Sequence, residues 1–155
     1  MLNSTGPRVS VIIHFLDAEE FFDEAIASVL RQTFTEWELL LVDGGSVDRS
    51  PQRVKVWQDK FPHKIRSLRH PGPDTLGIFS SRIWGAQEAR GAVLAHLDAD
   101  DVWHSHFLER QYEIYQQHFQ IRPGMVYCPM VYSWQMPALA HLNWLADGIS
   151  LNRPP

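Results

Sequence analysis

The sequence predicts an α/β fold, a mostly parallel sheet with helices on both faces. Short apolar runs rich in β-branched residues alternate with amphipathic helical segments, which is the pattern of repeated βαβ units. Three of these runs end abruptly in acidic or glycine-rich loops, as strands do at the edge of a sheet. With 155 residues, of which 45% are hydrophobic, the chain is long enough for one domain with a buried core.

The first strand is expected at Val9–Phe15, where β-branched residues predict burial on both faces. Asp17 precedes Glu20 by three residues, which resembles a capping box and predicts the start of a helix. That helix carries an apolar stripe made of Phe22, Ala25, Ile26, Val29 and Leu30. A second strand is expected at Glu38–Val42, and it runs into the loop Asp43-Gly44-Gly45-Ser46.

The next segments continue the alternation. Ser50 as N-cap and Pro51 at the first helical position predict a second helix, with Val54, Trp57 and Phe61 on one face. Lys64–Arg69 is expected to form a strand. A third helix is predicted over Ile78–Ala89, and Gly91 is placed to end it.

The last predicted strands are Ala92–Leu97, which ends in Asp98-Ala99-Asp100-Asp101, and Met125–Tyr132. Between them, apolar residues at helical spacing predict a fourth helix around Phe107, Leu108, Tyr112 and Tyr115. We therefore expect a flexible N-terminus at residues 1–8 and one domain over residues 9–133. Residues 134–155 are expected to be an irregular tail or the beginning of a further half.

Composition excludes several classes of function. Fourteen Lys and Arg against 18 Asp and Glu give a net charge of −4, which disfavours general attraction to nucleic acid. The single Cys128 cannot form an internal disulfide, and no Cys/His spacing resembles a zinc site. No apolar run is long enough to cross a bilayer, and Met1–Pro7 has no secretory core. We expect a cytoplasmic protein that meets a membrane only through segments outside this chain.

Acidic residues follow three of the predicted strands: Asp17, Asp43 and the group Asp98 to Asp101. Ligands of open α/β sheets bind beyond the carboxyl ends of the strands. Crowded carboxylates repel one another unless a cation or hydrogen-bond donors gather them. Mg²⁺ and Mn²⁺ prefer oxygen ligands and commonly bind one or two carboxylates together with phosphate oxygens. A divalent cation and a phosphate-bearing ligand are the expected partners.

Each acidic feature also has a purely structural interpretation. Asp43 with the following glycines is typical of an Asx-type turn, and one acid of the group at Asp98 is enough to cap the fourth helix. His104 and His106 flank Ser105, the expected cap of that helix, which disfavours a role as metal ligands. A response-regulator receiver also binds Mg²⁺ at strand ends, but it requires an early acidic pair and a late-strand Lys that are not visible.

Four stretches, taken together, resemble a known family. They are Val9-Ser10-Val11-Ile12-Ile13, the helix Ala25 to Phe34, Glu38 to Asp48, and Ala89-Arg90-Gly91 leading to Leu97-Asp98-Ala99-Asp100-Asp101-Val102-Trp103. Their order and spacing over residues 9–112 resemble the nucleotide-binding half of a family-two glycosyltransferase. Members of this family are inverting enzymes with the GT-A (nucleotide-diphospho-sugar transferase) fold. The resemblance implies a fold that is incomplete at its C-terminal end in this chain.

The resemblance implies a role for each candidate residue. Asp43 would contact the base or ribose of the donor, and Asp98 and Asp100 would form the Asp-X-Asp element. Asp98 would lie near the ribose and, with Asp100, at a Mg²⁺ or Mn²⁺ that bridges the diphosphate. Arg82 would face the diphosphate or brace the acidic loop, or be an ordinary surface residue. Phe15, Asp17 and Asp74 complete the expected nucleotide site, and Asp74 is equally well placed as a helix N-cap.

The chain differs from the family pattern after its first strand. Relatives often have Pro or Thr, an aromatic residue and Asn there, whereas this chain has His14, Phe15, Leu16 and Asp17. Relatives often show two adjacent acids where this chain has Asp43-Gly44.

The resemblance implies a metal-dependent transferase that moves a sugar, most simply from a UDP-sugar, to a hydroxyl of a saccharide or a lipid-linked acceptor, with inversion. The general base of this family lies well downstream of the Asp-X-Asp loop. Asp147 is the only Asp or Glu after Glu113 and is therefore a weak candidate. The base is expected outside this chain, and exposed apolar surface near Trp134 would favour self-association. The alternative is a truncated or degenerate module that binds the nucleotide sugar without transferring it.

Overall fold

The computed structural model describes residues 6–69, 77–118 and 124. Strands and helices alternate along the described chain, as predicted. They are β1 (Val9–Phe15), α1 (Phe22–Leu30), β2 (Trp37–Asp43), α2 (Ser50–Lys60), β3 (Ile65–Arg69), α3 (Gly77–Glu88), β4 (Val93–Asp98) and α4 (Phe107–His118). The chain forms two compact units that divide after Ser105. The predicted strand Met125–Tyr132 and the predicted boundary at residue 133 lie outside the described residues.

Four parallel strands form the sheet, in the order β3-β2-β1-β4. The chain moves outward from β1 through β2 to β3, and α3 then returns it to the other side of β1. The strand order therefore reverses between β1 and β4, which is where ligands bind in open α/β sheets. In register, Phe15 lies beside Asp43 and His14 beside Asp98, so these strand ends meet at one edge.

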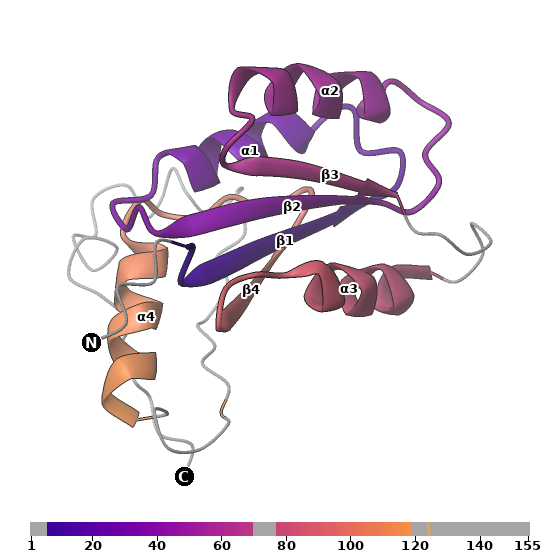
Figure 1. Cartoon of the computed structure of the whole chain (residues 1–155). Coiled ribbons are helices and arrows are strands. Elements are labelled where there is room, and N and C mark those ends of the chain that lie inside the picture. Colours follow the sequence, from indigo (N-terminus) through magenta and orange to yellow (C-terminus); the bar gives the residue numbers. More distant parts are fainter. Residues whose placement is uncertain (1–5, 70–76, 119–123, 125–155) are drawn as a thin grey trace, which may run out of the picture. The chain divides into compact units, whose positions relative to one another are not determined.

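Helices cover both faces of the sheet, with α1 and α2 on one side and α3 on the other (Figure 1). β1 and β2 are buried almost throughout, as their β-branched and leucine-rich sequences predict. Ile12, Leu40 and Val42 form the core under α3. A Cβ on Gly85 would lie 2.7 Å from Cγ2 of Ile12, so α3 packs this closely only because residue 85 is glycine.

Two predicted helix starts are wrong. α1 begins at Phe22 and has no side-chain cap, so Asp17 and Glu20 form no capping box. Ser50 lies inside α2, whose N-cap position is Arg49, and the Arg49 side chain makes no capping hydrogen bond. Asp17 and Ser50 instead bond across the two loops, through partners about thirty residues away in the sequence that local spacing does not reveal.

A buried polar network closes the opposite, amino-terminal end of the sheet. The Glu38 carboxylate accepts hydrogen bonds from the Ser10 hydroxyl (2.8 Å), the Arg90 backbone N–H (2.7 Å) and the Arg66 guanidinium (3.1 Å). Arg66 also donates to the carbonyl of Glu88 at the end of α3 (2.9 Å). This network therefore ties β1, β2 and β3 to the end of α3.

Candidate functional site

The carboxyl edge of the sheet brings together the acids that the sequence places after three strands. Asp43 is the last residue of β2 and Asp98 the last of β4, with the end of β1 between them. Parallel pairing makes this meeting unavoidable, because all carboxyl ends of a parallel sheet lie at one edge. The candidate site therefore lies where the strand order reverses.

Asp17 joins the loop after β1 to the loop after β2. Its backbone has a positive φ of 51°, and its Oδ1 accepts hydrogen bonds from the N–H groups of Val47 (2.8 Å) and Asp48 (3.2 Å). Its own N–H donates to the Ser46 hydroxyl (3.1 Å). Asp17 thus holds two loops of the edge together.

Asp48 makes the return connection between the same loops. Its carboxylate accepts hydrogen bonds from the Glu19 N–H (3.0 Å), the Ser50 N–H (2.9 Å) and the Ser50 hydroxyl (2.9 Å). Burial by itself raises the pKa of Asp48, but these hydrogen bonds outweigh it and leave the pKa below its ordinary value. Sequence reasoning gave Asp48 no role, although an acid two residues before a Ser-Pro helix start is a signal for a capping contact.

Asp43 makes the Asx-type turn that its flanking glycines predict. Its Oδ1 accepts hydrogen bonds from the N–H groups of Gly45 (3.0 Å) and Ser46 (2.8 Å), and Gly45 has a positive φ of 106°. The side chain is buried, with 6% of the residue exposed. Within the described part of the chain, Oδ2 makes no hydrogen bond. The turn therefore uses only one of the two carboxylate oxygens.

Two replacements of Asp43 should separate these uses. Asp43→Asn keeps an oxygen that can accept from Gly45 and Ser46, so we expect little change in the free energy of unfolding. Asp43→Ala removes that acceptor and should cost about 1 kcal/mol, as the loss of a side-chain cap does. Both variants should bind a nucleotide more weakly. Urea titrations and calorimetry measure the two effects, and full nucleotide affinity in Asp43→Asn would assign the residue to the turn alone.

Arg82 of α3 pairs with Oδ1 of Asp98, so it braces the acidic loop. The side chain of Asp98 is 48% exposed, and within the described residues its Oδ2 has no partner. The turn that follows is closed by a bond from the Asp101 N–H to the Asp98 carbonyl (3.1 Å), and Asp100 is exposed. Burial, and then the charges of Asp100 and Asp98, raise the pKa of Asp101. Asp98, Asp100 and Asp101 thus form an acidic turn in which Asp98 pairs with the Arg82 guanidinium.

His14 lies inside this charged edge, and sequence reasoning gave it no role. Burial, with the nearby Arg82 charge, lowers its pKa, and the charges of Asp98 and Asp43 oppose that shift. Its Nε2 lies at the Asp43-Gly44 turn, since a Cβ on Gly44 would be 2.9 Å from it. The available signal was an imidazole side chain near the carboxyl end of a mostly apolar strand.

The remaining predicted residues have different outcomes. Phe15 is 1% exposed and packs on Phe22, with ring centroids 4.7 Å apart, so its ring belongs to the core and only its backbone faces the edge. Asp74 and Asp147 lie outside the described residues.

Within the ranges that the structure describes, no three His, Cys, Asp or Glu side chains form a group that would hold a metal by themselves. Of the helices described, none is long and apolar enough to span a membrane.

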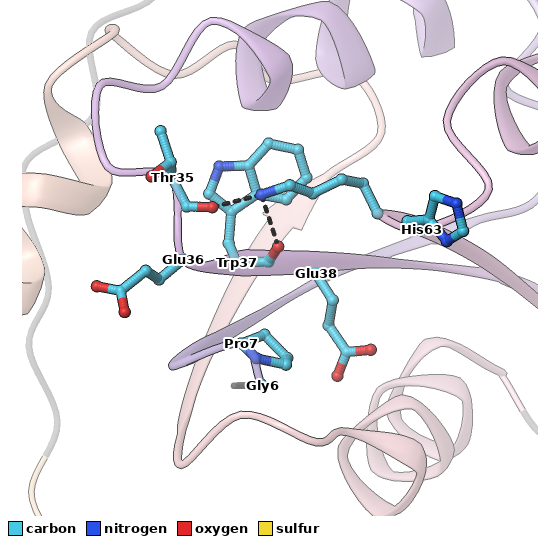
Figure 2. Close-up of a pocket in the computed structure, with 8 residues that line it drawn as sticks. Gly6, Pro7, Thr35, Glu36, Trp37, Glu38 and His63 are labelled. Carbon is cyan, nitrogen blue, oxygen red and sulfur yellow. Dashed lines mark hydrogen bonds between the residues drawn. The ribbon is translucent and has the colours of Figure 1, made fainter. Parts of the chain in front are cut away.

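A hollow of about 350 Å³ lies away from these residues, at the amino-terminal end of the sheet (Figure 2). It is lined by residues that include Glu36, Trp37, Glu38 and His63. The Lys64 ammonium donates to the carbonyls of Thr35 and Trp37 and lies 4.2 Å from the centroid of the Trp37 ring. Two of its N–H donors are therefore already engaged within the fold, and the hollow contains none of the predicted site residues.

Comparison with known proteins gives consistent matches over this region. The family described as "Glycosyl transferase family 2" matches residues 10–144. An uncharacterized glycosyltransferase, alr2836 of Nostoc, is 38% identical over 109 residues, which are 70% of this chain and 33% of the relative. The UDP-Glc:alpha-D-GlcNAc-diphosphoundecaprenol beta-1,3-glucosyltransferase WfgD of Escherichia coli is 34% identical over 103 residues, 66% of this chain and 39% of that protein.

A solved structure matches the fold. The crystal structure of S. aureus TarS 1–349 in complex with UDP has a TM-score of 0.62 and 21% identity, over 72% of this chain and 32% of that one. This chain therefore has a GT-A glycosyltransferase fold, as the sequence resemblance implies. The chain spans about a third of the length of the proteins it matches.

Proposed function

Because this chain belongs to glycosyl transferase family 2, we propose that it is the donor-binding part of an enzyme that transfers a sugar from a UDP-sugar to an acceptor hydroxyl, with inversion. The observation that carries the proposal is the meeting of Asp43, Asp98 and Asp100 at the point where the strand order reverses. The UDP-glucose donor named for WfgD and the UDP bound to TarS support the choice of nucleotide.

Asp43, Asp98 and Asp100 would bind different parts of the donor. Oδ2 of Asp43 is available to a donor group of the nucleoside, and Oδ2 of Asp98 to a ribose hydroxyl or a cation. Asp98 and the exposed Asp100 would hold a Mg²⁺ or Mn²⁺ ion, since these cations prefer carboxylate oxygens and commonly bind one or two carboxylates beside a phosphate. When bound, such an ion stabilises the charge on the departing nucleoside diphosphate. Arg82 keeps the Asp98 carboxylate oriented at the edge.

Transfer also requires an acceptor and a base. Inversion follows when the acceptor oxygen attacks the anomeric carbon from the side opposite the diphosphate while a carboxylate removes its proton. Asp147 is the late acid in the sequence and the candidate base within it, and we propose that further acceptor elements come from the two thirds of the relatives' length that this chain does not span. We propose a saccharide or lipid-linked acceptor, as the name of WfgD states for that enzyme.

The proposal is tested by calorimetric titration of the chain with UDP in the presence of Mn²⁺ and in the presence of EDTA. We expect binding to be roughly tenfold or more tighter with the metal, since a cation held by Asp98 and Asp100 would attract the charged diphosphate. Incubation with UDP-sugars and analysis of released UDP then measures turnover. Equal affinities in both buffers would remove the metal from the proposal. Metal-dependent binding without turnover would favour a module that holds the donor but does not transfer it.

A further inference from the structure

His14 is the polar group at the carboxyl edge to which the proposed function assigns no role. We propose that its imidazole recognises the donor's base by donating a hydrogen bond to a ring carbonyl, while Asp43 accepts from the adjacent ring N–H. The inference rests on the proposed function and deepens it. It assigns the site to bases with a carbonyl next to a ring N–H, such as uracil, thymine and guanine.

The position of His14 supports this role. It is the penultimate residue of β1, paired in register with Asp98, and the next residue is paired with Asp43. Neighbouring strands lie about 4.8 Å apart, so one planar base can span from His14 to the end of β2. The residue is half-buried, with Nε2 against the Asp43-Gly44 turn. His14 therefore lies near the end of the strand between the two that end in Asp43 and Asp98, at the point where the strand order reverses.

Apart from His14, the site groups described above are either hydrogen-bond acceptors or donors that already have a partner within the fold. Asp43 and Asp98 are acceptors, and each has one oxygen that makes no hydrogen bond within the described part of the chain. The Arg82 guanidinium is held by Asp98, and the Gly44 N–H already donates to the Phe15 carbonyl (2.9 Å). No bond to the His14 ring is found among the described residues. An imidazole carries at least one N–H in either protonation state, so His14 supplies a donor beside these acceptors.

An acceptor beside a donor selects one kind of base edge. Uracil presents N3–H next to a carbonyl, and guanine presents N1–H next to a carbonyl. Cytosine and adenine present an unprotonated ring nitrogen next to an exocyclic amine, which would place a lone pair against the Asp43 carboxylate and an N–H against the His14 N–H. A site built to satisfy hydrogen bonds rejects a ligand that leaves them unmade.

Gly44 makes room for this arrangement. A Cβ at residue 44 would lie 2.9 Å from His14 Nε2 and 3.3 Å from the Phe15 carbonyl oxygen, so any side chain there displaces the imidazole. The histidine and the glycine are therefore one structural unit. The second acid that the family often has at this position is incompatible with the imidazole where it now lies.

The test compares UDP with CDP, each with Mn²⁺, in wild type, His14→Leu and His14→Gln. Wild type should bind UDP roughly tenfold tighter than CDP, since tenfold corresponds to one well-made hydrogen bond. His14→Leu should lose most of that preference through weaker UDP binding. His14→Gln, which keeps an N–H donor, should retain part of it. Gly44→Ala should resemble His14→Leu, and adding it to His14→Leu should change the preference no further.

Circular dichroism and melting temperatures confirm that the variants are folded. His14→Leu with an unchanged preference for UDP over CDP would overturn the assignment of His14 and leave the proposed function intact. Equal binding of UDP and CDP by wild type would also overturn it. Absence of any nucleotide binding by folded wild type would overturn both proposals.

Discussion

Replacing Asp100 with asparagine is expected to remove most of the metal dependence of UDP binding. Asp100 is exposed on the turn after β4, two residues beyond Asp98, whose side chain is 48% exposed, so its carboxylate is open to a cation. An amide oxygen brings no charge to the ion. Loss of a supporting contact to a bound metal costs about 10- to 100-fold in affinity, and loss of a ligand should cost at least as much. Calorimetry with UDP in Mn²⁺ and in EDTA measures the effect.

Asp59→Asn is the matched control for this experiment. It makes the same change of charge on α2, where Asp59 is exposed and pairs with Lys55. The control should bind UDP as wild type does in both buffers. If Asp100→Asn and Asp59→Asn both lost the same affinity for UDP, the loss would come from the change in net charge and not from removal of a metal ligand. Unchanged metal dependence in Asp100→Asn would exclude Asp100 from the cation site.

Replacing Glu38 is expected to have the largest effect on stability. The Glu38 side chain is 5% exposed and accepts from Ser10, Arg90 and Arg66. Glu38→Ala leaves the largely buried Arg66 guanidinium without this carboxylate and removes the acceptor of the other two donors. Breaking a buried pair in this way costs roughly 3 to 5 kcal/mol, and the remaining contact of Arg66 to Glu88 places the expectation at the lower end. Urea unfolding at neutral pH measures it.

The same carboxylate predicts a dependence of stability on pH. Burial raises the pKa of Glu38, but the hydrogen bonds from Ser10, Arg90 and Arg66 outweigh it, and the pKa in the folded protein lies below the ordinary value of 4.5. A lowered pKa means that the stabilisation is complete above pH 4.5 and is lost as the pH falls from there through the folded pKa. The stability difference between wild type and Glu38→Gln should therefore narrow in acid.

Glu36→Gln is the control for Glu38. Glu36 pairs with Arg8 at 2.9 Å, but both side chains are nearly half exposed. An exposed pair contributes less than about 1 kcal/mol, so this variant should unfold nearly as wild type does. If Glu38→Gln were no less stable than Glu36→Gln, the network at the amino-terminal end would not be holding the sheet together.

Hydrophobic periodicity predicted the strands and helices because each of them depends on a local pattern of apolar residues. The β-branched run of β1 and the leucine-rich run of β2 are central strands, and both are buried on their two faces as their sequences require. The two helix N-caps predicted from local spacing were wrong because their side chains bond to residues that are distant in the sequence. Asp17 and Ser50 have the side chains of N-caps, but each has a better partner in the loop that parallel pairing brings alongside it.

The side chains of the first strand show where pattern alone is insufficient. Successive residues of a strand point to opposite faces, so Phe15 and His14 must diverge. Only the packing of α1 decides that the Phe15 face is filled by Phe22 and belongs to the core. His14 lies on the other face, beside Asp98 and Arg82, and remains at the edge. The sequence resemblance implies that Phe15 belongs to the nucleotide site, whereas the structure leaves only its backbone at the edge.

The sequence by itself determined the alternation of strands and helices, and with it the meeting of Asp43 and Asp98 at one edge, because parallel connections leave all carboxyl ends on the same side. Only the tertiary structure decided how each acid is used. Asp17 and Asp48 accept hydrogen bonds from backbone N–H groups of the neighbouring loop. Asp43 uses one carboxylate oxygen in a turn, and Asp98 forms an ion pair with Arg82. Hydrogen bonding depends on atoms within about 3 Å, and such neighbours come from segments that the sequence keeps far apart.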